Sequence, residues 1–198
     1  MSDPTAVRLW VGHTLTVTET ALAFLEDAPR HGALCRPLDR LPEVHHPIGS
    51  GEAAIPDALL YYRLGPVGDD SGSMLRAFVE VDRATMGPER LAAKLPSYQH
   101  FHCYVPTPPG RRPTIQEPAL EEWRRHYPLF PRLLFVLDGT GLAGVETRGS
   151  SLRATAAQLT TSHFLNDVTV LAASLANLLQ HGPSAPMWRP VRDPDLVT

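Results

Sequence analysis

The sequence predicts an α/β fold in which one mixed sheet of about four or five strands has helices on both faces. Two neighbouring segments rich in Leu, Tyr, Phe and Val, 58–64 and 75–82, read as an antiparallel hairpin around a Gly/Asp/Ser turn. Two later segments, 132–137 and 167–172, are short and almost wholly apolar, as buried strands are. Segments with helical periodicity separate these strands, so helices and strands alternate along the chain.

The part of the chain before the hairpin is expected to hold a helix and a loop. Residues 14–28 carry leucines at helical spacing, and the helix is predicted to close near Pro29. A short strand is expected at 33–36. The polar stretch 37–52, with Pro, Gly and His, reads as a loop.

After the hairpin, Pro88 has the backbone angle and position of a first helical residue. The helix is expected to run to residue 101, with a kink or break at Pro96. Residues 105–114 are rich in proline and read as a loop, and 117–126 reads as a short helix.

Two more helices are expected, one at 141–157 and one that follows the last strand and ends at Gly182, a favourable C-cap. Residues 182–198 are predicted to form an extended tail packed on the core of a single domain, 1–198.

Composition limits the classes of function. The chain has 198 residues, of which 43% are hydrophobic, enough for one sizeable core. Its net charge of −3 and its two cysteines indicate neither a protein that coats nucleic acid nor a disulfide framework. With no signal peptide and no long apolar run, we expect a cytoplasmic protein without a membrane partner.

Binding to DNA would therefore depend on local arginine clusters rather than on overall charge. The sequence offers three such clusters: Arg111 with Arg112, Arg124 and Arg125 with His126, and Arg189 with Arg192. Lysine is almost absent: Lys94 is the only one in the chain.

Acidic residues gather at one end of the predicted hairpin. If Leu64 pairs with Leu75, Asp57 falls opposite Asp82, and Glu80 shares one face with Asp82 because side chains alternate along a strand. Carboxylates that meet in a small volume favour a bound cation or an extra proton, and hard oxygen ligands suit Mg²⁺ or Mn²⁺. The alternative is that these acids are simply solvated at strand ends.

Several spaced motifs resemble one known family. They occur in the expected order along nearly the whole chain: HTLTV (13–17), PDALL (56–60), FVEVDRATM (78–86), LAAKLPSY (91–98), LLFVLDG (133–139) and GPSAPMWRPV (182–191). Together they are similar to the replication-relaxation proteins of actinobacterial plasmids and integrated mobile elements. That family in turn resembles the PD-(D/E)XK, or restriction-endonuclease-like, superfamily, which implies a mixed sheet flanked by helices and Mg²⁺-dependent phosphodiester hydrolysis.

The resemblance assigns roles to individual residues. Asp57 corresponds to the first acid and Glu80 to the second acid of the PD-(D/E)XK motif. Position 82, where the motif has its lysine, holds Asp82, which becomes a third metal ligand or the group that orients the water. Lys94, one helix later, is positioned to supply the missing amine, as some members of the superfamily do. Glu19 on the first helix is a weaker candidate ligand through water.

Other residues offer weaker hypotheses. Tyr98 shares a helix face with Lys94, so a tyrosine nucleophile is conceivable, although a packing role is favoured. His13 is expected to be structural. His100 and Cys103 have the spacing of one zinc-ligand pair, but only His45-His46 offers a second pair, and a structural zinc site needs four ligands.

Two classes of function follow. The first is a metal-dependent DNA nickase or endonuclease that serves plasmid replication or transfer, with DNA and other plasmid replication or transfer proteins as partners. The second is a non-catalytic DNA-binding or protein-interaction module on the same fold, which Asp82 and the acidic net charge favour. A homodimer is compatible with either. The position of Lys94 relative to the carboxylates discriminates between them.

Overall fold

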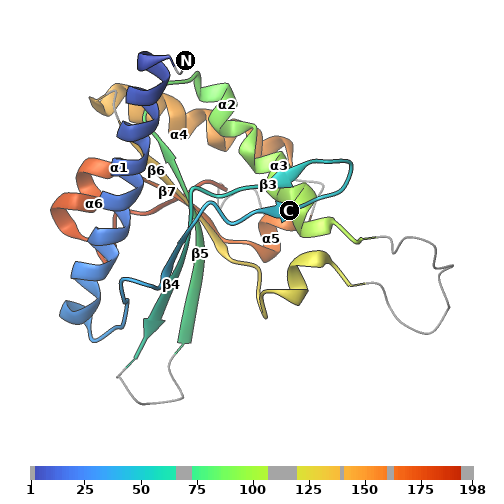
Figure 1. Ribbon diagram of the computed structural model, residues 1–198, viewed down its shortest axis with the longest axis horizontal. Helices are drawn as coiled ribbons and strands as arrows, with labels where there is room; N and C mark the ends of the chain where they lie inside the picture. Colours follow the sequence, from blue (N-terminus) through green and yellow to red (C-terminus); the bar gives the residue numbers. More distant parts are fainter. Residues whose placement is uncertain (1–2, 66–72, 107–119, 139–140, 160–162, 193–198) are drawn as a thin grey trace, which may run out of the picture.

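A six-stranded mixed sheet forms the centre of the molecule (Figure 1). The computed structural model describes residues 3–65, 73–106, 120–138, 141–159 and 163–192. Within these ranges the strands of the sheet follow their order in the chain: β1 (Arg40–Pro42), β4 (Ala58–Leu64), β5 (Ser73–Asp82), β6 (Arg132–Leu137), β7 (Val170–Ser174) and β8 (Arg189–Pro190). Two further short strands, β2 (His46–Pro47) and β3 (Ala53–Ala54), pair with each other.

The sheet is mixed, as the sequence predicts. Strand β4 runs antiparallel to both β1 and β5, whereas β5, β6 and β7 are parallel, and β8 returns antiparallel to β7. The expected tail thus contributes an edge strand. The parallel strands β5, β6 and β7 all end at the same edge of the sheet, and β5 brings Asp82 to that edge.

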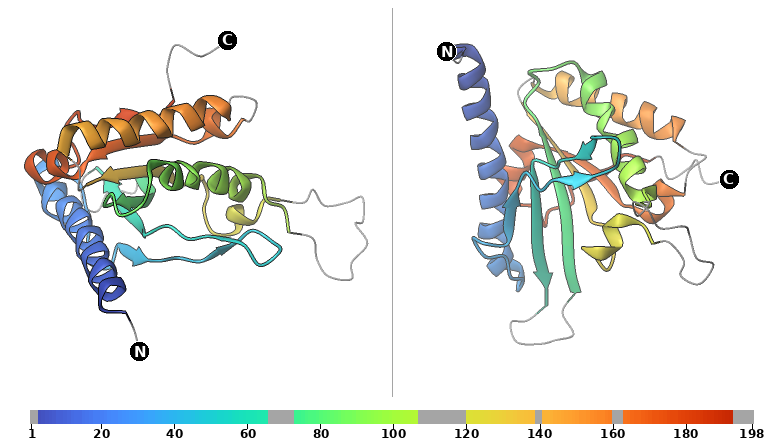
Figure 2. Two further views of the ribbon diagram at one scale, coloured as in Figure 1. Left: turned by 90° about the horizontal axis from the view of Figure 1, so that it is seen from above. Right: turned by 45° about the vertical axis from the view of Figure 1, so that its right-hand side comes forward.

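Helices cover both faces of the sheet (Figure 1 and Figure 2). The first face packs against α1 (Pro4–Asp27) and α6 (Leu175–His181), and the second against α2 (Pro88–Ala92), α3 (Lys94–Cys103), α4 (Gly141–Gln158) and α5 (Phe164–Asp167). Alternation along β5 divides the core accordingly: Val79 and Val81 face α1, while Phe78 faces α3. Two short 3₁₀ turns, Ala28–His31 and Glu122–Arg125, complete the described elements.

The hairpin register differs from the prediction by two residues. Leu64 lies opposite Ser73 rather than Leu75, and Ala58 lies opposite Val79. The cause is the length of β5, which begins two residues earlier than the apolar pattern indicates. A shift of two keeps every side chain on its predicted face, so Glu80 and Asp82 still share a face.

The first helix is longer than predicted, because it begins at Pro4 rather than near residue 14. Asp3 caps it by accepting a hydrogen bond from the backbone N–H of Thr5 at 3.0 Å, and proline is well suited to the first helical position. The first turns of the helix lie in solvent, so their side chains follow no core-facing period. Figure 2 shows this end of α1 reaching the level at which β5 ends and α2 begins.

The helix predicted from Pro88 is broken, but at Ala93 rather than at Pro96. Proline removes one backbone donor and clashes with the carbonyl four residues earlier, here that of Ala92. The chain therefore ends α2 at Ala92 and starts a new helix at Lys94, which leaves Pro96 in the first turn, where proline is tolerated.

Three shorter predictions were also wrong. The expected strand at 33–36 is a single bridge between Leu34 and Arg63, and β1 instead lies within the stretch read as loop. The expected helix at 117–126 is a 3₁₀ turn in its described part. None of the helices in the described ranges has the length and hydropathy needed to cross a membrane.

Candidate functional site

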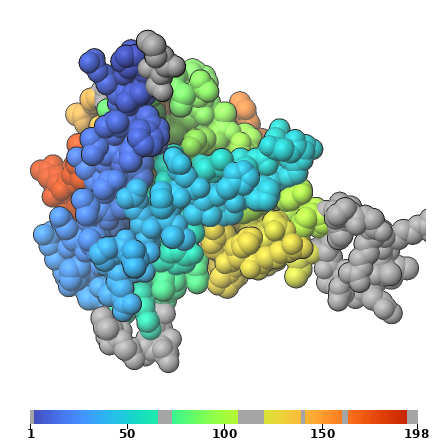
Figure 3. Space-filling model, viewed as in Figure 1, coloured from blue at the N-terminus to red at the C-terminus, as the bar shows by residue number. Residues whose placement is uncertain are grey.

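A cavity of about 300 Å³ lies at the carboxyl end of β5, between the N-terminal half of α1 and the start of α2. In Figure 3 these two segments, dark blue and green, stand side by side at one end of the molecule. The four residues that the sequence predicts as catalytic all line this cavity: Asp57, Glu80, Asp82 and Lys94.

Glu80 is the most buried of these acids, with 1% of its surface exposed. Its position in a central strand places it beneath α3, where Oε1 accepts a hydrogen bond of 2.5 Å from the hydroxyl of Tyr98. Oε2 forms an ion pair with the amine of Lys94. Burial raises the pKa of Glu80 to about 7, against the opposing effect of the lysine.

Lys94 connects two carboxylates. As the first residue of α3 it places Nζ against Glu80 and 3.9 Å from Oδ1 of Asp57. Burial alone would lower the pKa of Lys94, but the two carboxylates outweigh it and raise that pKa. The amine is therefore held as a cation between two acids.

Asp57 precedes β4 and is held by groups from three elements. Its Oδ2 accepts a hydrogen bond of 2.7 Å from the backbone N–H of Val81, and its Oδ1 lies 3.2 Å from Nε2 of His13 on α1. Burial acts to raise the pKa of Asp57, but His13, Lys94 and the Val81 amide together lower it. The hydrogen bond to Asp57 in turn raises the pKa of His13.

Asp82 has a different environment from the other two acids. Its Oδ2 pairs with the guanidinium of Arg148 on α4, and its Oδ1 accepts a hydrogen bond of 3.1 Å from the backbone N–H of Ala84. Ala84 has a left-handed φ of 57°, which is uncommon for a non-glycine residue, and the hydrogen bond supports this turn. Arg148 also donates to the carbonyl of Met86 at 3.1 Å. Asp82 thus fastens the end of β5 to α4.

Sequence reasoning missed several residues of the cavity. Arg148 lies 66 residues from Asp82 in a helix without a recognisable motif, so no local signal marks the pair. Trp10, Arg83 and Arg90 also line the cavity or its rim. The only available signal was the proximity of Arg83 and Arg90 to the acidic strand end and to Lys94.

The remaining predicted residues lie elsewhere. Glu19 is exposed on α1 and does not line the cavity. Arg124 and Arg125 form ion pairs with Glu121 and Glu122, at 2.6 and 3.2 Å. Arg111 and Arg112 lie outside the described residues. Over the ranges that the structure describes, no three His, Cys, Asp or Glu side chains are grouped in a way that could hold a metal ion. His100 and Cys103, the candidate zinc ligands, are therefore not part of such a group.

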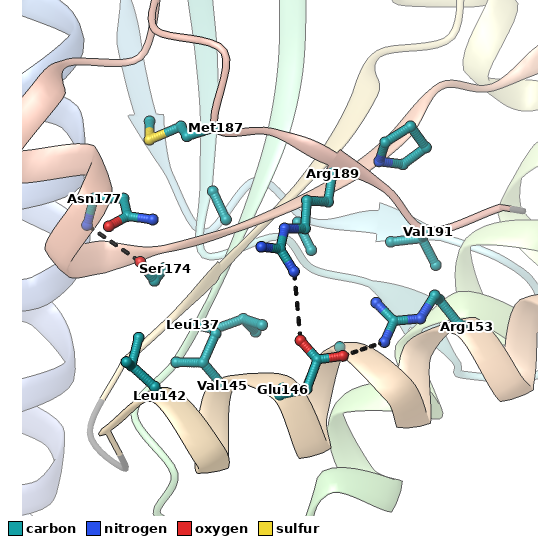
Figure 4. A pocket seen from close by; sticks show the side chains of 14 residues that line it. Leu137, Leu142, Val145, Glu146, Arg153, Ser174, Asn177, Met187, Arg189 and Val191 are labelled. Carbon is teal, nitrogen blue, oxygen red and sulfur yellow. Dashed lines mark hydrogen bonds and ion pairs between the residues drawn. The ribbon is translucent and has the colours of Figure 1, made fainter.

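A second cavity, of about 310 Å³, lies between α4 and the β7–β8 edge (Figure 4). Its lining is mainly apolar, and an ion-pair bridge crosses it: Glu146 contacts Arg153 at 2.6 Å and Arg189 at 3.5 Å. The acid is fully engaged by the two arginines, so this cavity offers a weaker case for chemistry than the one at Lys94.

The fold and the first cavity define a mixed α/β protein that holds a lysine between two carboxylates at the end of a central strand. The family model described as replication-relaxation matches residues 5–110, just over half of the chain, and this range contains all four predicted catalytic residues. The chain belongs to the replication-relaxation family, which suggests a role in plasmid replication or relaxation. No curated protein and no solved structure matches it significantly.

Proposed function

We propose that this protein binds DNA and cleaves a phosphodiester bond with Mg²⁺ or Mn²⁺, as a nickase or endonuclease of plasmid replication or transfer. The observation that carries the proposal is the amine of Lys94, which contacts Glu80 and lies 3.9 Å from Asp57 at the cavity. A catalytic amine must reach the reacting atoms, and this one approaches both carboxylates from α3, one helix after the position at which the PD-(D/E)XK motif has its lysine.

The fold supports the same superfamily assignment. A mixed sheet flanked by helices, with the two motif acids at the adjoining ends of a β-hairpin, is what a restriction-endonuclease-like core requires. The high arginine and proline content fits an actinobacterial source.

Asp57 and Glu80 fit a magnesium site. Proteins often hold Mg²⁺ through only one or two carboxylates, with water and substrate phosphate completing its coordination, so a preformed cluster of three ligands is not required. Both carboxylates line the cavity, and each oxygen that accepts a hydrogen bond retains a second lone pair. When bound there, the cation would activate water and neutralise charge on the phosphate.

The protein's own groups supply the rest of the chemistry. Lys94 stabilises the negative charge that develops on the phosphate oxygens, because its ammonium is already oriented by two carboxylates. Tyr98 orients Glu80 through its hydrogen bond of 2.5 Å. His13 positions Asp57 from the opposite side. Asp82 acts as a structural residue, since Arg148 and the Ala84 amide already hold both of its oxygens.

The test is cleavage of supercoiled plasmid in the presence of Mg²⁺ or Mn²⁺. Wild-type protein is expected to produce nicked or linear DNA, and Glu80→Gln is expected to produce neither. Glu19→Gln serves as the matched control, because Glu19 is an exposed acid outside the cavity, and it should cleave like wild type. Wild-type protein that cleaves none of a range of DNA substrates would remove the enzymatic proposal.

A second candidate is a DNA-binding or protein-interaction module without activity. The observation that favours it is the Asp82–Arg148 ion pair. Asp82 stands at the sequence position of the motif lysine, and its carboxylate is bound by an arginine of the protein itself. This candidate predicts DNA binding that is unchanged by Glu80→Gln together with no cleavage by wild type. A second copy of the chain, or another plasmid replication or transfer protein, would then be the natural partner.

A further inference from the structure

The rim of the first cavity combines an exposed aromatic ring with two arginine side chains. Trp10 on α1 is 63% exposed although it lines the cavity. Arg83 and Arg90 line the same cavity, and neither forms an ion pair with an acid in the part of the chain that the structure describes. The carboxylates and Lys94 line the same cavity.

Arg83 is held in place by a glycine in the middle of a helix. Its guanidinium packs directly on Gly12 of α1, closer than a Cβ at that position would allow. Nη1 lies 3.5 Å from the carbonyl of Leu9, and Nε is buried without a hydrogen-bond partner among the described residues. A guanidinium that is fixed by packing and left with an unpaired charge is suited to bind an anion.

A tryptophan ring beside such an arginine matches the two parts of a nucleotide. Proteins bind single-stranded DNA by stacking bases on aromatic rings and by placing arginine or lysine on the backbone. The volume of about 300 Å³ lies at the lower end of the range for small-ligand sites. A base that has left the stack exposes its face to an aromatic ring, whereas a paired base inside a duplex has both faces covered by its neighbours.

We propose that this rim binds one nucleotide of a single-stranded or locally unpaired DNA segment, with the base stacked on Trp10 and the phosphate held by Arg83 and Arg90. This inference rests on the proposed function and narrows its substrate class to single strands. The phosphate would then lie over Lys94, at the edge of the two carboxylates.

The experiment measures binding of a labelled oligothymidine by fluorescence anisotropy with EDTA present, so that no cleavage occurs. Trp10→Ala is expected to weaken binding by roughly 5- to 150-fold, the contribution of one stacked base. An oligonucleotide with abasic sites should bind more weakly than oligothymidine and should lose no further affinity from Trp10→Ala. A blunt duplex of equal length should be insensitive to the same substitution.

Two variants serve as matched controls. Leu15→Ala removes an apolar side chain that is 59% exposed on the same helix but does not line the cavity. Arg153→Ala removes an arginine that lines the second cavity. Both should bind oligothymidine like wild type, whereas Arg83→Ala and Arg90→Ala should weaken binding and its dependence on salt. Circular dichroism melting verifies that each variant is folded.

The outcomes separate this inference from the proposed function. Trp10-dependent binding of single strands by a protein that cleaves nothing would support the inference and remove the enzymatic proposal. Glu80-dependent cleavage with unchanged oligothymidine binding by Trp10→Ala would overturn the inference alone. A loss of self-association in both Trp10→Ala and Leu15→Ala, with DNA affinity unchanged, would overturn it in favour of a second copy docking on α1.

Discussion

The carboxylate of Asp82 at the end of β5 is paired with the guanidinium of Arg148, which reaches it from the middle of α4. Both side chains are almost fully buried, at 8% and 7% exposure of the residue. The pair joins the carboxyl end of β5 to α4 in the helix layer.

Removing the arginine should therefore destabilise the fold. Arg148→Ala leaves Asp82 buried and unpaired, and we expect a loss of about 3–5 kcal/mol in the free energy of unfolding. The double variant Asp82→Ala with Arg148→Ala should recover part of that loss. Urea denaturation measures both. Arg153→Ala is the control, because it breaks an exposed pair on the same helix and should leave the unfolding midpoint unchanged.

The carboxyl group of Glu80 should titrate near neutral pH in the metal-free protein. With a pKa of about 7 when folded, against an ordinary value of 4.5, it binds a proton in the folded state over a range where the unfolded chain has released it. Its contribution to stability is present below pH 4.5 and is lost as the pH rises through about 7. The fall in unfolding free energy across this window should be smaller in Glu80→Gln. An equal fall in the unfolding free energy of both proteins would mean that a group other than Glu80 titrates in this window.

Tyr98 should tune that titration. Its hydrogen bond to Oε1 stabilises the charged carboxylate and so lowers the pKa of Glu80. In Tyr98→Phe the pKa should move higher, which carboxyl carbon NMR can follow directly. Tyr104→Phe is a suitable control, since Tyr104 follows the same helix but makes no contact with Glu80. A downward shift in Tyr98→Phe would contradict the proposed orientation of the hydroxyl.

His13 offers an independent measure of the geometry around Asp57. Its pKa is raised above 6.5 chiefly by the hydrogen bond to that carboxylate. In Asp57→Asn the charge is gone, so the pKa of His13 should fall, as read from its ring-proton NMR shifts. Glu19→Gln, six residues along α1, should leave the His13 titration unchanged. If the pKa of His13 is the same in Asp57→Asn and in wild type, the two side chains are not in contact.

Gly12 should separate stability from binding. Alanine is favoured over glycine in a helix by about 1 kcal/mol, so Gly12→Ala should not lower the melting temperature. Its methyl group must displace the Arg83 guanidinium, however, so affinity for single-stranded DNA should fall. Gly149→Ala in α4 is the matched control, because a Cβ there meets only Arg153, at 3.4 Å. Unchanged DNA binding by Gly12→Ala would show that the position of Arg83 is unimportant.

Local patterns determined much of the fold. The alternation in 58–64 and 75–82, the apolar run 132–137 and Pro88 at a helix start each act within a few residues, and the structure confirms the elements they predict. Period-two alternation also determined that Glu80 and Asp82 share a face, because a shift of the register by two residues does not alter it. Charge clustering at one strand end located the cavity.

Only the tertiary structure decided the partners of those charges. The pairing of Asp82 with Arg148, the contact between His13 and Asp57, and the seat of Arg83 on Gly12 each join segments at least 44 residues apart. The periodicity of the sequence cannot predict contacts between segments so far apart, because these contacts depend on how the helices pack over the sheet. The sequence therefore determined that acids gather near the end of β5, and packing decided which acid pairs with an arginine and which acids share the lysine.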